Sequence, residues 1–465
     1  MHTHTGSNTG QRLTRTLRAL AAAVTAAAAA ALAAGCHDYL TGGELSNDPN
    51  RPSAATNRQL FVGVQTNLWA TLASDPARVA GMLVQQFEGT NGQYVSIYHY
   101  GITEQQTNGF NAGVYVAGGL RDLRLLQDGA RAQGDTLFLG VAQVQEALLV
   151  GTAADLFGDV VYSQALAGTP NPPLDPQLDV YDAVQALLSA AITNLSSFGG
   201  AATNLGPGSA DLSYGGDPAK WVALAHTLKA RYFLHTAEVR GAAAYASALA
   251  EARLGIQAPA GDFDAVFSGN AGEENFFKQF DVDQRPGYLT PNTQFVALLE
   301  GRSDPRLADY FNPHQTDLSN ARLAANFPQP LVTAQENLLV WAEAAQRGGN
   351  DGAARAQLDA ERALTPGLAP LPSDLAGRDL LREILAEKYV ALFQNVEVWS
   401  DYRRTCFPNL TPVVAGQKIP ARLLYDTNER QTNTSIPPAQ SQPTRNANDP
   451  ANRTSDGTGE ACLGQ

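Results

Sequence analysis

Apolar residues recur every three or four positions over most of the chain, which is the spacing that gathers them on one face of an α-helix. The pattern begins with Leu60, Val64, Leu68 and Leu72. It predicts helices over residues 56–73, 76–87, 104–132, 135–158, 180–195, 333–347, 353–364 and 381–396. We therefore expect a mainly α-helical protein with irregular connections.

Residues 217–252 predict a pair of antiparallel helices. Asp217-Pro218 supplies the N-cap and first-turn residues of a helix start, and an apolar stripe runs from Trp221 to Tyr232. Beyond a turn at Gly241, a second helix carries small residues on its apolar face. Such pairs are similar to tetratricopeptide repeats, although a strict repeat period is absent.

The stretch Gly151–Leu166 closes the helix predicted over 135–158 and carries two carboxylates, Asp155 and Asp159. Their spacing brings side chains together on a helix, as a catalytic acid–base pair requires. Alternatively, these acids fix the turn that follows, at a helix end where the dipole disfavours negative charge. We favour the structural interpretation.

The N-terminus has the features of an export signal. Arg12, Arg15 and Arg18 precede an Ala/Leu/Val run over residues 19–34 that ends in Gly35-Cys36. The end of this run resembles a bacterial lipobox, with its leucine one position early. We expect a signal peptide over residues 1–35, a lipidated Cys36 with a tether over 36–55, and one domain over 56–465. A plain secretory signal is the alternative.

Composition and charge exclude some partners. The hydrophobic fraction of 44% is that of a globular protein, and the formal net charge is -13. An acidic chain without a basic run is unsuited to nucleic acid or to an anionic bilayer surface.

The remaining cysteines, Cys406 and Cys462, form an even pair if Cys36 carries lipid. Because disulfides are permitted in exported proteins, we expect these two to be bridged. The rival interpretation makes Cys406 a nucleophile, but histidine is absent from its sequence neighbourhood.

Tyrosines mark the candidate ligand site. Tyr94, Tyr98 and Tyr100 lie in a loop predicted over residues 93–103, and Tyr288 is a further candidate. Aromatic rings beside polar groups hold sugars by packing on the apolar face of a pyranose. The alternative is that these rings belong to the core.

Other groups give weaker signals. Four acids could ligate calcium, but their spacing matches no loop motif and a solvated acidic face is the better interpretation: Glu273, Glu274, Asp281 and Asp283. His226 and His235 fall on opposite sides of a helix, which argues against a shared metal. We expect Arg403 or Arg404 to pair with Asp401 or Glu397 rather than to clamp an anion. The sequence calls for no metal and no cofactor.

Catalytic motifs are missing. The sequence contains no G-x-S-x-G, no H-E-x-x-H, no P-loop and no dinucleotide fingerprint. A pair of catalytic carboxylates of the glycosidase type is still compatible with the sequence, because its two members can lie far apart along a chain. We therefore expect a protein that is not an enzyme.

Seven stretches, in this order, resemble the SusD/RagB family of outer-membrane nutrient-binding lipoproteins. They are AADLFGDVVYSQAL (153–166), LDVYDAVQALLSAAITNL (178–195), GGDPAKWVALAHTLKARYFLH (215–235), SDPRLADYF (303–311), ENLLVWAEAAQRGGN (336–350), ILAEKYVALFQNVEVWSDYRRT (384–405) and RLLYDTNE (422–429).

The resemblance implies a domain with four tetratricopeptide-like helix pairs as scaffold and an irregular, loop-rich part that bears the ligand surface. It also implies a lipid anchor at Cys36, a place at the surface of the outer membrane, and a TonB-dependent transporter as partner. Family ligands are mostly glycans and sometimes peptides. With four tryptophans in the chain, the family's aromatic platform does not map residue by residue.

The resulting hypothesis is a non-catalytic lipoprotein that captures an oligomeric nutrient and acts as the lid of its transporter. The rivals are a helical-repeat scaffold lipoprotein without a small ligand and a glycan hydrolase.

Overall fold

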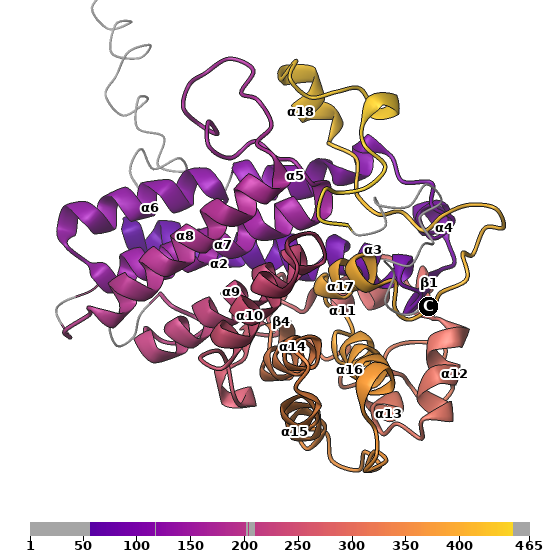
Figure 1. Cartoon of the computed structure of the whole chain (residues 1–465). Coiled ribbons are helices and arrows are strands. Elements are labelled where there is room, and N and C mark those ends of the chain that lie inside the picture. Colours follow the sequence, from indigo (N-terminus) through magenta and orange to yellow (C-terminus); the bar gives the residue numbers. More distant parts are fainter. Residues whose placement is uncertain (1–55, 117, 201–202, 204–209, 450–465) are drawn as a thin grey trace, which may run out of the picture. The chain divides into compact units, whose positions relative to one another are not determined.

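The computed structural model describes residues 56–116, 118–200, 203 and 210–449. The chain divides into two units, 1–56 and 57–465, and every element below belongs to the second. This unit is mainly helical (Figure 1), which confirms the predicted fold class. Its principal helices are α2 (Asn57–Ala73), α3 (Asp75–Leu83), α4 (Gly92–Tyr98), α5 (Asn108–Tyr115), α6 (Leu120–Gln133), α7 (Thr136–Phe157), α8 (Gln177–Ser196), α9 (Pro218–Arg240), α10 (Ala242–Ala252), α14 (Ala334–Arg347), α15 (Asp351–Arg362), α16 (Gly377–Ala391) and α17 (Glu397–Thr405).

Shorter elements fill the irregular part. They are the helices α11 (Phe276–Lys278), α12 (Thr293–Gly301), α13 (Arg306–Tyr310) and α18 (Thr427–Thr432), and a π-helical turn over Gln279–Gln284. Strand β1 (Phe87–Gly89) pairs antiparallel with β3 (Leu289–Pro291), and β2 (Phe263–Ala265) with β4 (Gln329–Val332). The first of these pairs joins segments about two hundred residues apart in the sequence.

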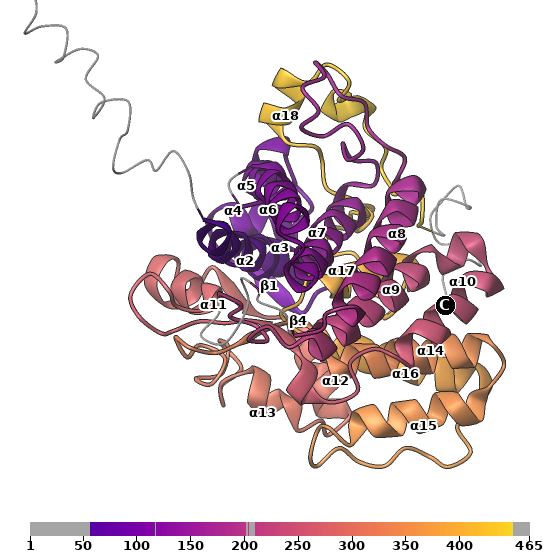
Figure 2. The same cartoon turned by 90° about the vertical axis from the view of Figure 1, so that its left-hand side faces the viewer.

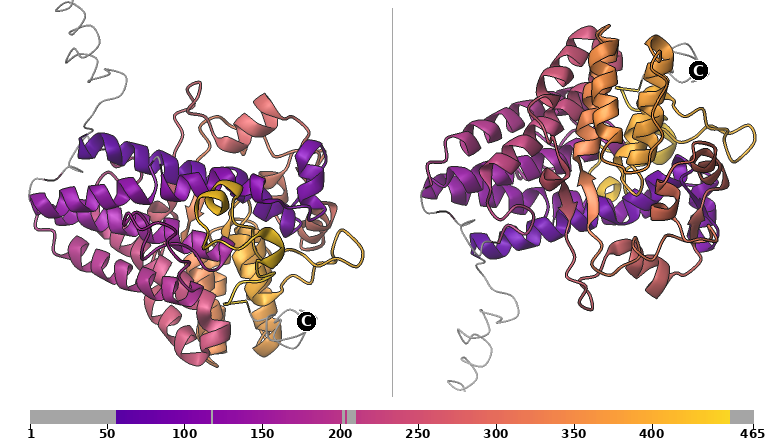
Figure 3. Two further views of the ribbon diagram at one scale, coloured as in Figure 1. Left: turned by 90° about the horizontal axis from the view of Figure 1, so that it is seen from above. Right: turned by 90° about the horizontal axis from the view of Figure 1, so that it is seen from below.

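Helices that follow one another in the sequence pack side by side. Helix α7 contacts α6, α8 and α9, and α14 contacts α10, α15 and α16. Figure 2 shows α7 between α6 and α8. From above and below, the long helices of residues 57–240 run alongside one another, and the orange helices of residues 334–391 cross that direction (Figure 3). The antiparallel pairs agree with the tetratricopeptide-like pattern.

Helix α7 is the centre of the core. Within the described ranges it is the one helix long and apolar enough to cross a bilayer, but 94% of that window is buried inside the protein. Glycines allow its neighbours to approach closely: a Cβ at Gly140 would lie 2.5 Å from Leu195 of α8, and one at Gly151 would overlap the ring of Tyr232 in α9. Because such packing needs small residues at the crossings, α7 is a core helix.

The C-terminal end of α7 is capped by segments that come much later in the chain. The carbonyl of Asp155 accepts from Arg403 Nη1 and from Asn446 Nδ2, both at 2.6 Å. The carbonyl of Phe157 accepts from Arg422 Nη2 at 2.7 Å. Two guanidinium groups at the negative end of the helix dipole stabilise carbonyls that a helix leaves without partners.

Several predicted helices are interrupted. The helix predicted over 104–132 is wrong: it consists of a short 3-10 turn, α5 and α6, separated at Gly118-Gly119. Gly118 has φ +86°, and a Cβ there would lie 2.6 Å from Asn67. A glycine is required where the backbone takes this conformation against α2.

Three further boundaries differ from the prediction. Helix α3 ends at Leu83, so Phe87 lies in β1, and the predicted loop 93–103 contains α4. The helix predicted over 381–396 ends at Ala391, and α17 begins after a turn in which Gln394 has φ +60°. Apolar residues stay buried through these turns, so hydrophobic periodicity continues where the helix does not.

A buried ion cluster joins α14, α16 and α17. Glu343 is fully buried and accepts from Arg404 Nη1 at 2.6 Å, Arg404 Nη2 at 2.7 Å and Lys388 Nζ at 3.1 Å. Asp401 binds Lys388 Nζ at 2.5 Å and Arg404 Nη2 at 2.9 Å. Burial alone would raise the pKa of Asp401, but Lys388 and Arg404 hold it below its usual range. The predicted pairing of Arg404 with Asp401 is confirmed.

Candidate functional site

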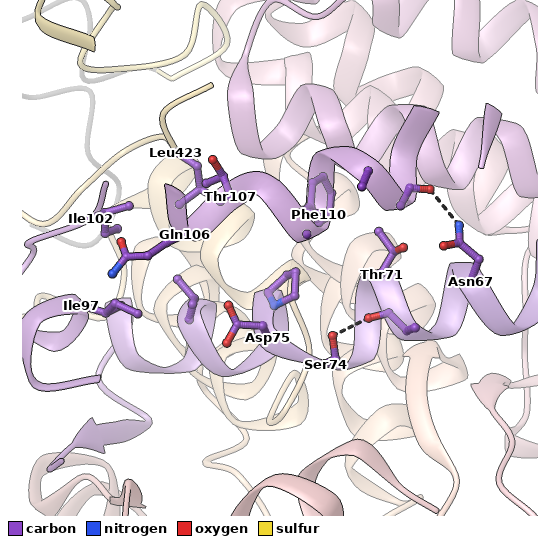
Figure 4. Close-up of a pocket in the computed structure, with 16 residues that line it drawn as sticks. Asn67, Thr71, Ser74, Asp75, Ile97, Ile102, Gln106, Thr107, Phe110 and Leu423 are labelled. Atoms are coloured by element: carbon purple, nitrogen blue, oxygen red, sulfur yellow. Dashed lines mark hydrogen bonds between the residues drawn. The ribbon is translucent and has the colours of Figure 1, made fainter. Parts of the chain in front are cut away.

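A groove of about 380 Å³ lies between α2 and α3 on one side and α5 on the other (Figure 4). This volume is within the range of small-molecule sites. Most of its lining is apolar, and Asp75 is the one charged residue in it. The lining residues are Asn67, Ala70, Thr71, Ser74, Asp75, Pro76, Val79, Ile97, Ile102, Gln106, Thr107, Gly109, Phe110, Ala112, Gly113 and Leu423.

The groove arises where α2 gives way to α3. Ser74 donates to the carbonyl of Ala70, and Pro76 occupies the first turn of α3, a position where its missing N–H costs nothing. On the opposite wall, α5 presents glycines: a side chain at Gly113 would overlap Thr71, and no atom lies within 4 Å of a Cβ at Gly109. Gly113 therefore lets α5 approach α2 closely, and Gly109 leaves space open beside the groove.

The polar end of the groove is held by a network under α3. Tyr94 Oη donates to Asp75 Oδ1 at 2.6 Å, and Arg78 Nε donates to Tyr94 Oη at 2.7 Å. Arg78 Nη2 lies 3.6 Å from the same Asp75 oxygen. The Asp75 side chain keeps 46% of its surface exposed, whereas that of Arg78 keeps 8%. A ligand entering the groove therefore meets the carboxylate and not the guanidinium.

Two of the predicted ligand tyrosines belong to the core. Tyr94 is 1% exposed and Tyr98 is 8% exposed. Burial raises the pKa of Tyr94 above its ordinary value and that of Tyr98 to about 12. Tyr98 Oη accepts from Asn292 Nδ2 at 3.0 Å. Their burial favours the core interpretation, and a direct role of either ring in binding stays a prediction.

The other two candidates are half-buried. Tyr100 Oη accepts from the backbone N–H of Val413 at 2.8 Å, and burial raises the pKa of Tyr100. Tyr288 packs edge-on against Phe280, which itself stacks on Tyr94 at 4.8 Å. Pairing of β1 with β3 brings Phe280 and Tyr288 to Tyr94 from a segment about two hundred residues away in the sequence.

None of the four candidate tyrosines lines the groove, although Ile97 and Ile102 of the stretch that carries three of them do. Ile97 lies in α4, within the stretch of tyrosines identified from the sequence, and Pro76 begins the helix predicted over residues 76–87. Phe110 and Leu423 gave no signal, because their part in the groove follows from how α5 and the chain after α17 pack.

A second polar cluster lies in the core, away from the groove. His235 Nδ1 contacts Asp155 Oδ1 at 2.7 Å, and its Nε2 contacts Glu397 Oε1 at 2.6 Å. Tyr181 Oη also donates to Asp155. Among the described residues, Asp155, His235 and Glu397 form the one group of three side chains of metal-binding type whose ligand atoms lie close together. Because the two carboxylates engage opposite nitrogens of the ring, both nitrogens donate and the cluster is a buried ion triad, to which we assign no metal. Asp159 instead accepts from the N–H of Gln177.

The triad predicts a fall in stability at alkaline pH. Burial alone would lower the pKa of His235, but Asp155 and Glu397 raise it to about 9. Since the folded pKa exceeds the unfolded value of about 6.5, the stabilisation is complete below about pH 6.5 and is lost as pH rises through about 9. Its upper bound is about 3 kcal/mol. Urea unfolding of the wild type and of His235→Gln across this range measures it, and equal pH slopes for the two proteins would contradict the assignment.

The other candidates from the sequence have local partners. Lys278 Nζ binds Glu274 at 2.5 Å and Asp283 at 2.8 Å, and Glu273 accepts from Ser268. Asp281 is buried, which raises its pKa to about 8. Glu274 and Asp283 thus share one lysine, whereas Glu273 and Asp281 do not contact it, so the four acids do not gather around a single ion site among the described residues.

Cys406 ends α17 in the left-handed conformation and is disulfide-bonded. Cys36 and Cys462 both lie outside the described residues, so the bridge to Cys462 and the lipid at Cys36 stay predictions.

The comparisons agree with this architecture. The SusD-like family model, described as starch-binding and associating with the outer membrane, matches residues 49–426. A SusD/RagB family protein from Bacteroides thetaiotaomicron is 21% identical, with a TM-score of 0.67, over 82% of this chain and 95% of that chain. A chitin-binding SusD homolog from Flavobacterium johnsoniae is 18% identical, with a TM-score of 0.67, over 84% and 96%. A SusD homolog from Bacteroides fragilis reaches a TM-score of 0.69 at 17% identity, over 85% and 97%. A search of curated proteins gave no match.

Proposed function

Because the chain belongs to the SusD-like family of starch-binding proteins that associate with the outer membrane, we propose that it binds an oligomeric glycan and delivers it to a TonB-dependent transporter. The single observation that carries the proposal is the family match, which spans residues 49–426. The groove at Asp75 supplies a place for the ligand. Its walls pack against the CH faces of sugar rings, and its polar end receives hydroxyl groups.

The groove also supports a binding role over a hydrolytic one. Glycoside hydrolysis generally needs two carboxyl groups flanking the scissile bond. The residues that line the groove include one carboxylate, Asp75, and it already accepts from Tyr94. The groove therefore lacks the second carboxyl group that hydrolysis of a bound glycan would need. We propose a protein that binds its ligand and releases it unchanged.

Binding in the groove is testable by filling it. Gly109→Trp places a large ring in the groove from a helical position where a Cβ meets nothing within 4 Å. We expect at least a tenfold loss of glycan affinity in isothermal titration, which corresponds to about 1.4 kcal/mol. Gly63→Trp is the matched control, since Gly63 in α2 is equally unobstructed and does not line the groove. Unchanged affinity for Gly109→Trp would place the ligand elsewhere, and absence of any glycan binding would favour the helical-scaffold alternative.

Attachment to the membrane is the second part of the proposal. Residues 1–35 would be removed, Cys36 would carry lipid, residues 36–55 would form a tether, and residues 56–465 would form a single domain. Isolation of the native protein from outer membranes tests this. We expect a lipid-modified Cys36 in the mass of the N-terminal peptide and a large barrel protein that copurifies. An unmodified Cys36 would refute the anchor, and purification without a barrel would refute the transporter partnership.

A further inference from the structure

The groove offers a bound molecule mostly hydrogen-bond acceptors. Ser74 and Thr107 already donate their hydroxyl protons to backbone carbonyls, of Ala70 and Glu104 respectively. Their oxygens are therefore left to accept. When it is ionised, the Asp75 carboxylate accepts hydrogen bonds and cannot donate them. A ligand that fits this set of partners must bring donors of its own.

Asp75 adds a negative charge that the groove does not fully neutralise. Its Oδ1 is bound by Tyr94, while its Oδ2 makes no hydrogen bond or ion pair with any residue that the structure describes. Arg78, the nearest cation, is turned toward the protein: its Nε is bound to Tyr94 Oη, and its Cζ lies 4.3 Å from the centroid of the Phe280 ring. The open oxygen of Asp75 thus remains for a charged donor on the ligand.

Gln106 supplies a hydrogen-bond donor on the wall. Gln106 accepts from the N–H of Thr103 at 2.7 Å through Oε1, which leaves its NH₂ group for a ligand oxygen. Figure 4 shows Gln106 opposite the α3–α4 wall that carries Asp75 and Ile97. The rest of the lining is mostly apolar and includes the ring of Phe110. The site therefore suits a ligand with apolar faces, many donors and a cationic group.

We infer that the glycan in the groove is an amino-sugar oligosaccharide whose free amine binds Asp75. This inference rests on the proposed function, because it names the class of glycan. The protonated amine donates hydrogen bonds to Asp75 Oδ2, the ring hydroxyls donate to Ser74 and Thr107, and the ring CH faces pack on Val79 and Ile97. The net charge of -13 adds a long-range attraction for a cationic ligand.

A ligand series with a charge-removing variant tests the inference. Isothermal titration of the full mature chain, in mildly acidic buffer where sugar amines are protonated, compares a β-1,4-linked glucosamine hexamer, its N-acetylated counterpart, maltohexaose and a lysine-containing peptide. We expect the free-amine hexamer to bind about tenfold more tightly than the two neutral glycans, because a hydrogen bond to a charged group contributes that much. Asp75→Asn keeps an acceptor for Tyr94 and should abolish this preference.

Asp128→Asn is the matched control, because Asp128 is a solvent-exposed carboxylate of α6 outside the groove, and it should leave the preference intact. Equal binding of neutral and amine-bearing glycans, or a preference that survives Asp75→Asn, would overturn the inference and leave the proposed function standing. Binding of the peptide without any glycan, or of no ligand at all, would overturn both. Thermal unfolding of Asp75→Asn confirms that a loss of affinity is not a loss of fold.

Discussion

Replacing Arg404 by methionine is expected to lower the free energy of unfolding by about 3–5 kcal/mol. The guanidinium is 2% exposed and binds both oxygens of the fully buried Glu343 as well as Asp401. Without it, Lys388 is left to neutralise two buried carboxylates. One negative charge then stays buried without compensation, and the desolvation penalty of that charge is the source of the loss.

The effect of Arg404→Met is measured by urea unfolding. Arg131→Met, which removes an exposed pair with Asp128, should cost at most about 1 kcal/mol, because solvent screens such pairs. A second replacement, Glu343→Gln, in the Arg404→Met background should recover part of the loss, because it removes the orphaned charge. A loss for Arg404→Met as small as that for Arg131→Met would show that water or rearrangement relieves the cluster.

Phe393→Ala is expected to cost about 3–5 kcal/mol as well, through a cavity in an aromatic cluster. The ring of Phe393 lies 4.2 Å from that of Tyr310, 5.0 Å from Phe87, 5.3 Å from Phe311 and 5.6 Å from Phe295, measured between centroids. It is 2% exposed. The rings come from β1, α12, α13 and the turn after α16, so one side chain supports four segments.

Phe393→Leu is the control for that variant, since it keeps most of the volume and should cost clearly less than the alanine. Denaturant unfolding followed by tyrosine absorbance reports both. If the alanine and leucine variants were equally stable, the cluster would have collapsed around the missing ring, and the cavity argument would fail.

Hydrophobic periodicity sufficed to predict the fold class and most of the helices. It located α2, α7 and α14 to within a residue or two, and the N-cap at Asp217 accepts from the N–H of Ala219 as expected. It failed at the break between α5 and α6 and at the end of α16. At both points buried apolar residues continue the helical spacing through a turn. The glycine pair at 118–119 is a sequence signal for the first break, and the second has no comparable signal.

The candidate site was harder to predict, because it depends on contacts between distant segments. The run of tyrosines lies beside the groove, yet the first of its rings, Tyr94, lies beneath it and donates to Asp75. From the sequence, Asp75 was only the residue before a helix predicted to start at Pro76, whereas the structure makes it the first residue of α3. Its exposure to a groove follows only when α5, with its glycines, packs opposite α3.

The capping of α7 has a consequence for the order in which the protein folds. The side chains that bind its last carbonyls stand 248, 265 and 291 positions further along the chain. Until those residues have been synthesised, the final turn of α7 keeps its carbonyls hydrated and cannot be buried at full stability. Contacts of such long separation form slowly, because the entropy of closing the intervening chain opposes them. The end of the central helix is thus capped only when nearly the whole chain is present, and a partial chain lacks these hydrogen bonds. This suits a protein that, as we propose, crosses a membrane before it folds.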